Sequence, residues 1–70
     1  MPDHVYKVVE VVGTSKESIS KAIETGIGKA ASTLRQVGWF EVISIRGHVA
    51  DSKINHYQVA LKVGFTLEDR

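Results

Sequence analysis

The chain has 70 residues, no cysteine and a formal net charge of +1, from nine Lys and Arg against eight Asp and Glu. The lack of cysteine excludes a disulfide framework and a thiolate metal site, and the balanced, evenly spread charge argues against binding to nucleic acid. A chain this short buries only about 60% of its unfolded surface, so its core alone is marginally stable. We therefore expect one domain, residues 1–70, that gains stability as a homo-oligomer.

The hydrophobic segments are too short for a membrane protein. None of them approaches the about 20 residues of a membrane span, and the opening residues, MPDHVYK, lack the apolar core of a signal peptide. The sequence thus predicts no membrane partner and a cytoplasmic location.

The first predicted element is a strand from His4 to Val12, because β-branched residues dominate this segment and Gly13 follows it. Thr14, with Glu17 three residues later, fits a capping box. Ser15 is the competing N-cap. With either residue as the N-cap, a helix is expected to begin within the next few residues.

That helix is expected to span about 20 residues, because apolar side chains recur at steps of three and four. The stripe contains Ile19, Ala22, Ile23, Ile27, Ala30, Leu34 and Val37. Gly38 stands where a left-handed C-terminal stop is expected. The run GIGKAA at 26–31 matches the loose dinucleotide pattern, but it falls inside the helix and not at a strand-to-helix turn. Close packing of the helix is the better explanation for its glycines.

Two further strands, 39–49 and 55–68, are joined by the polar segment ADSKIN and predict a hairpin. In the last strand the odd-numbered side chains are apolar and are expected to face the helix: Tyr57, Val59, Leu61, Val63, Phe65 and Leu67. In the strand before it, the apolar positions change from even to odd numbers, which predicts a bulge near Val42 and Ile43. The fold class is therefore α+β, with the order β-α-β-β.

With this bulge, Phe40 packs under the helix, and Trp39 stands on the opposite sheet face, beside Arg46 and Gln58. The residues alone favour Trp39 as an anchor in a subunit interface. The other interpretation is a stacking platform for a planar ring, with Gln58 pairing to the ring edge and Arg46 binding a phosphate. The two are compatible if the ligand lies in the interface.

Metal binding and catalysis have little support. His48 and His56 flank the hairpin turn and could pair across it, but no ligand run such as H-E-x-x-H accompanies them or His4. No motif marks an activated nucleophile. We therefore expect no metal and no enzymatic activity. Binding of single-stranded RNA is a further alternative, but Trp39 and Tyr6 are too few aromatic residues for a platform.

At these residues the sequence resembles the dodecins, which are small flavin-binding proteins. Three blocks over nearly the whole chain carry the resemblance: VYKVVEVVGTS, WFEVISIRGHV and YQVALKVGFTLED. It implies a three-stranded antiparallel sheet wrapped around one long helix, and a hollow assembly of twelve subunits. It also implies that the protein stores, buffers and photoprotects flavin mononucleotide (FMN), without turnover, as stacked pairs between Trp side chains at two-fold interfaces.

Carried over residue by residue, the resemblance makes Trp39 the stacking residue, Gln58 the contact to the polar ring edge, and Arg46 part of the FMN pocket. Riboflavin and FAD are further candidate flavins, and coenzyme A is a further candidate ligand. Similar bacterial sequences often have an arginine at the position of Thr66 and an acidic residue at that of Gly38, which leaves the preferred flavin open. The alternative function is a structural oligomer, or a coenzyme A or nucleotide-binding protein, in which Trp39 is only an interface anchor.

Overall fold

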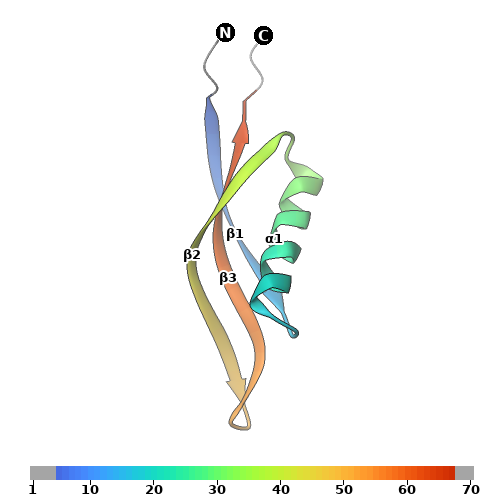
Figure 1. The fold of residues 1–70 in the computed structure, drawn as a ribbon, viewed down its shortest axis with the longest axis vertical. Helices are drawn as coiled ribbons and strands as arrows, with labels where there is room; N and C mark the ends of the chain where they lie inside the picture. The colour runs from blue at the N-terminus through green and yellow to red at the C-terminus, as the bar shows by residue number, and fades with distance from the viewer. Residues whose placement is uncertain (1–4, 68–70) are drawn as a thin grey trace.

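The computed structural model describes residues 5–67, which form β1 (Tyr6–Ser15), α1 (Ile19–Thr33), β2 (Val37–Ala50) and β3 (Lys53–Thr66). The strands form one antiparallel sheet in the order β1-β3-β2, and α1 lies along one face of it (Figure 1). The predicted α+β class and β-α-β-β order are confirmed. Within this part of the chain, α1 is neither long nor apolar enough to cross a bilayer.

The central strand β3 supplies most of the core. Val59, Leu61 and Val63 are fully buried, which confirms that these three odd-numbered side chains face the helix. Each of the three contributes about 1.5–3 kcal/mol through burial. Leu67, in contrast, lies beyond the end of β3 and is 44% exposed. From the helix, small residues spaced four apart make the closest approach to the sheet: Ala22, Gly26 and Ala30.

The predicted bulge is present. Val42 pairs with Leu61, but Ser44 pairs with Ala60, so that Ile43 is the extra residue of β2. Because the bulge shifts the side-chain phase by one residue, Trp39 before it and Arg46 after it share the sheet face away from α1. We call this face the outer face, and the face covered by α1 the inner face.

The start of the helix differs from the prediction. β1 continues through Gly13 to Ser15, and the helix N-cap is Ser18, whose Oγ accepts a hydrogen bond from Lys21 N at 3.0 Å. Gly13 does not end the strand; it lies where α1 packs closest, and a β-carbon there would collide with the Ala22 carbonyl. Ser15 closes the intervening turn by accepting a hydrogen bond from Glu17 N at 2.9 Å. The predicted capping box is therefore wrong.

The helix ends sooner than predicted, after 15 residues and not about 20. In its last turn the Ala30 carbonyl accepts from Leu34 N at 2.8 Å and from Thr33 Oγ1 at 3.2 Å, and Leu34 leaves the helix with an extended backbone at φ −109° and ψ 146°. The chain then turns at Gln36, which has a φ of 60°. No glycine among the described residues has a positive φ, so Gly38 is not the stop, and it lies in β2.

The hairpin turn is tighter than the segment ADSKIN predicted. Only Asp51 and Ser52 lie between Ala50 and Lys53, with φ of 54° and 63°. Two positive φ angles are typical of the primed turn that matches the twist of a hairpin, and aspartate tolerates this conformation. The hairpin of β2 and β3 extends well beyond the N-terminal end of α1 (Figure 1).

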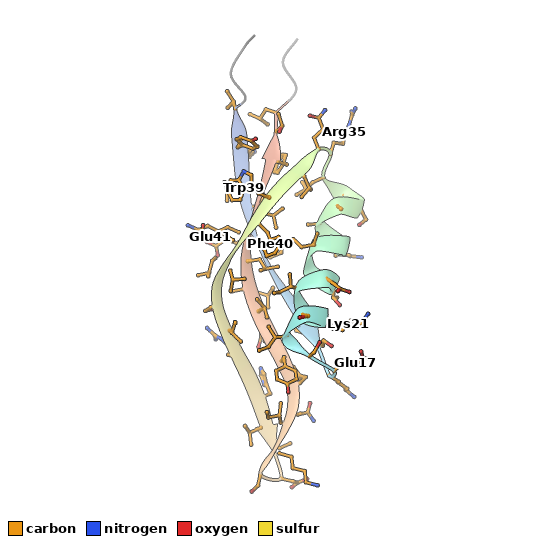
Figure 2. The ribbon with its side chains drawn as sticks, in the orientation of Figure 1. Glu17, Lys21, Arg35, Trp39, Phe40 and Glu41 are labelled. Atoms are coloured by element: carbon orange, nitrogen blue, oxygen red, sulfur yellow. The ribbon has the colours of Figure 1, made fainter. Side chains whose placement is uncertain are left out.

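The helix covers β2 only sparsely. Phe40 points toward α1, as predicted, while Trp39 and Glu41 point away (Figure 2). Yet Phe40 is still 48% exposed and lines an apolar groove of about 550 Å³ with Ile23 and Ile27 of the helix. Further along the inner face, Ile45 is also half exposed. One subunit therefore leaves a stripe of apolar side chains on the inner face of β2 uncovered.

Candidate ligand site

One end of the outer face is aromatic. The six-membered ring of Trp39 lies over Gly64, its partner on β3, and a β-carbon at Gly64 would overlap that ring. Tyr6 of β1 contacts the indole at a centroid distance of 5.9 Å and an interplanar angle of 58°. Tilted aromatic pairs of this kind contribute about 0.5–1.5 kcal/mol beyond burial. Gly64 and Tyr6 thus hold the indole on the sheet, while 38% of Trp39 stays exposed.

The other end of the outer face is polar and lies on the hairpin. Arg46 pairs directly with Gln58, and His48 pairs with His56 two residues closer to the turn. The two imidazoles stack with centroids 4.3 Å apart at an angle of 17°. His48 Nε2 is 2.8 Å from Gln58 Oε1. Since an amide oxygen only accepts hydrogen bonds, His48 is the donor.

These two ends do not meet within one subunit. Gly64 and Gln58 are six residues apart on β3, or about 20 Å at 3.3 Å per residue. The expectation that Trp39 stands beside Arg46 and Gln58 in one chain is therefore wrong, although all three share the outer face as predicted. Alternation of apolar and polar residues predicts the face on which a side chain lies, but not its distance along the strand from another residue on that face.

Thr66 belongs to the aromatic end. It is two residues beyond Gly64 on β3, and it pairs with Tyr6 of β1. Across the middle of the face, Lys62 stands between Glu10 of β1 and Glu41 of β2. This row of charges separates the aromatic end from the polar end.

Several of these positions were not found by sequence reasoning. The sequence analysis did not single out Gly64, because its role depends on its pairing with Trp39 in the β2–β3 register. His48 is a diagonal cross-strand neighbour of Gln58, because His48 pairs with His56 and Gln58 pairs with Arg46. The sequence analysis could not find their bond, because the segment ADSKIN did not define the register of the hairpin. No group of three potential metal ligands is present in the described part of the chain, and His4 lies outside it.

The family model for dodecin matches residues 5–68. The chain belongs to the dodecin family. It is 49% identical over 65 residues to the dodecin of Thermus thermophilus, covering 93% of this chain and 94% of that one. Dodecin from Streptomyces davaonensis superposes with a TM-score of 0.93 at 46% identity, over 97% of this chain and all of the other. Dodecin from Streptomyces coelicolor superposes with the same score at 44% identity, over the whole of both chains.

Family membership bears on assembly as well as on fold. Dodecin structures, together with the apolar stripe that one subunit leaves exposed on β2, indicate that the protein is oligomeric. Other structural neighbours are variants of the Thermus thermophilus dodecin in which a tryptophan or an arginine is replaced. Their backbones match this chain with TM-scores of 0.90 and 0.91.

Proposed function

We propose that the protein binds FMN and stores it as stacked pairs, each pair held between the Trp39 side chains of two subunits. The observation that carries this proposal is the indole of Trp39 lying over Gly64, with an accessible aromatic surface on the outer face. Stacking of a planar heterocycle on an aromatic side chain is worth about 1–3 kcal/mol. Membership of the dodecin family supports the choice of a flavin.

The pocket requires two subunits. Trp39 and Gln58 lie about 20 Å apart along one sheet, so residues of a single chain cannot surround one flavin ring. When the outer faces of two subunits meet around a two-fold axis, the aromatic end of one approaches the polar end of the other. Gln58 then pairs with the ring edge, and the Arg46 guanidinium binds the phosphate through charge-assisted hydrogen bonds.

The chemistry that this arrangement supports is protection and not turnover. The Trp39 indole would stack on the flavin as an adjacent electron donor, so that a light-excited flavin could return to its ground state by reversible electron transfer before oxygen or another substrate reacts. Both partners regain their starting state, and no bond is made or broken. The protein would therefore buffer free flavin and limit photodamage. A dodecamer with the ligands enclosed at its two-fold interfaces is the assembly that we propose for this role.

The test is a fluorescence titration of the purified protein with FMN. We expect quenching with a plateau near one flavin per subunit, because a pair of flavins is shared by a pair of subunits. If micromolar protein neither turns yellow nor quenches FMN, the alternative of a structural oligomer or a coenzyme A or nucleotide-binding protein, with Trp39 as an interface anchor, replaces this proposal.

A further inference from the structure

At the polar end of the outer face, four side chains contact one another in series: Asn55, His56, His48 and Gln58. The proposed function assigns a role only to Gln58. His56 Nδ1 is 2.8 Å from Asn55 Oδ1, His56 stacks on His48, and His48 Nε2 bonds to Gln58 Oε1. Both amide oxygens are acceptors, so each imidazole carries its proton on the nitrogen facing an amide. In this arrangement His48 carries its proton on Nε2 and His56 carries its proton on Nδ1.

We propose that His48 is a positioning residue for Gln58, holding its amide oxygen so that the amide nitrogen is the end presented to the ligand. This inference rests on the proposed function, because Gln58 is the residue assigned to the ring edge. The Gln58 amide nitrogen then donates a hydrogen bond to an acceptor on the edge of the bound heterocycle, either a carbonyl oxygen or a ring nitrogen.

The physical reason is the ambiguity of a free glutamine side chain. Its amide has an acceptor at one end and two donor hydrogens at the other, and the two ends have nearly the same shape. A half-turn of the amide exchanges them, so an unrestrained Gln58 divides its time between two arrangements. A bond from the Nε2–H of His48 favours the arrangement in which the amide oxygen faces the imidazole. Among residues 5–67 the Gln58 amide nitrogen has no hydrogen-bond partner, so it remains available to a ligand.

The same bond separates the roles of Gln58 and Arg46. These two side chains face each other directly in the β2–β3 register, and a guanidinium is a strong donor that would otherwise compete for the Gln58 amide oxygen. His48 takes one of the two acceptor positions of that oxygen. Within residues 5–67 Arg46 makes no hydrogen bond to Gln58, so its guanidinium remains available for an anionic group. On the β1 side, the neighbour of Gln58 is the uncharged Thr14.

His48 is itself held in place by the hairpin. It pairs with His56 across the ladder, and the near-parallel stack restricts rotation of both rings. The bond from His56 to Asn55 anchors the second ring. The arrangement is therefore a property of these residues together, and a substitution that keeps the stack but removes the N–H isolates the role of the hydrogen bond.

The experiment compares two variants with the parent protein. His48→Phe keeps an aromatic ring on His56 but cannot donate, whereas His48→Gln offers an amide N–H to the same oxygen. Each protein is titrated with riboflavin and with FMN, after light scattering and circular dichroism have shown that the assembly is unchanged. We expect His48→Phe to weaken both flavins equally, by about three- to tenfold, and His48→Gln to recover most of the loss.

Each alternative result has a distinct meaning. If the parent does not bind flavin, the proposed function fails and this inference fails with it. If the parent binds and His48→Phe binds equally well, this inference alone is wrong. A loss that His48→Gln does not recover also overturns it, because the effect then comes from packing. A measurement without ligand is the nitrogen-15 spectrum of the imidazoles, in which His48 protonated on Nδ1 instead of Nε2 contradicts the proposal.

Discussion

Trp39 and Gly64 face each other across the β2–β3 ladder, and the indole occupies the space that a side chain at position 64 would fill. The glycine is needed there for space and not for backbone freedom, since its φ is not positive. A broad aromatic surface on a sheet requires such a gap, because side chains on neighbouring strands otherwise stand about 5 Å apart and hold the ring away. The pair thus determines how close to the sheet a stacked ligand lies.

Gly64→Ala is expected to displace the Trp39 indole and to lower FMN affinity about tenfold, within the range of one lost stacking contact. The backbone accepts alanine at this position, so circular dichroism should remain unchanged. Gly47→Ala, on the same strand as Trp39, is the matched control, because its added methyl group meets only the His56 carbonyl oxygen at 3.5 Å, an ordinary contact. FMN titration of the three proteins decides the matter, and equal affinities would show that the position of the indole is unimportant.

Trp39→Ala should remove the stacking surface and abolish quenching of bound flavin. The expected loss is about 1–3 kcal/mol for each ring. Trp39→Phe should retain part of the affinity, because a phenyl ring still stacks, but it should quench less, since phenylalanine is a poorer electron donor. Time-resolved flavin fluorescence separates the two effects. Parent-like binding by Trp39→Ala would mean that the residue serves only the subunit interface.

Much of the fold could be predicted because period-two and period-3.6 patterns report directly on burial. The alternation in β3 and the phase change near Ile43 were sufficient to define both sheet faces and the bulge. Helix ends were predicted less well. Thr14 and Gly38 have the residue types of caps, but β1 continues to Ser15, with α1 packed closely on Gly13, and α1 ends at Thr33. Local propensities of about 1 kcal/mol do not prevail over such packing.

The sequence predicted on which face of the sheet the candidate site residues lie, but not where along the strands they lie. Trp39, Arg46, Gln58 and Thr66 all lie on the outer face, yet they occupy two separate ends of it. Alternation gives the side of the sheet on which a residue lies; distance along a strand requires the register, which depends on the turn. The two-residue turn at Asp51 and Ser52 carries neither of the dipeptides that signal such a hairpin.

The two glycines of the helix should respond in opposite directions to alanine. At Gly26 an added methyl group meets Leu61 Cδ1 at 3.1 Å and Gly13 Cα at 3.4 Å. Leu61 is fully buried, so overpacking of about 1–3 kcal/mol should exceed the helix gain of about 1 kcal/mol. At Gly28 nothing lies within 4 Å, and Gly28→Ala should stabilise the protein.

Urea unfolding at one fixed protein concentration tests this pair, because the stability of an oligomer depends on concentration. A lower midpoint for Gly28→Ala than for the parent would contradict the expectation. It would indicate that a second subunit packs closely against Gly28, which lines the same groove as Phe40.

Assembly should depend on the uncovered apolar stripe of β2. We expect the parent to run as a single species near twelve times 7.7 kDa in native mass spectrometry. Ile45→Glu places a charge on the exposed inner face and should give smaller species or unfolded chains, since an isolated core of this size is marginal. Lys16→Glu, at the exposed turn before α1, introduces the same residue and should leave the mass unchanged. A stable parent monomer at low micromolar concentration would contradict the proposed dodecamer.

Thr66 offers the most specific test of ligand choice, because the resemblance to bacterial dodecins leads us to expect an arginine at this position. It lies two residues beyond Gly64, or about 7 Å along β3 from the partner of Trp39, and about 26 Å from Gln58. A ligand stacked on Trp39 can therefore place its tail near Thr66 without reaching the Gln58 of the same subunit. Threonine offers this tail only a neutral hydroxyl group.

Thr66→Arg should tighten FMN binding by up to about tenfold at low salt, because a guanidinium adds a charge-assisted contact to the phosphate. The gain should shrink as the salt concentration rises, since an exposed charge is screened over about 10 Å at 0.1 M. Riboflavin has no phosphate and should hardly respond. Titrations of both flavins at two salt concentrations separate the possible causes. An equal gain for riboflavin would show that position 66 acts through packing or assembly, and a gain that salt does not reduce would exclude direct binding of the phosphate.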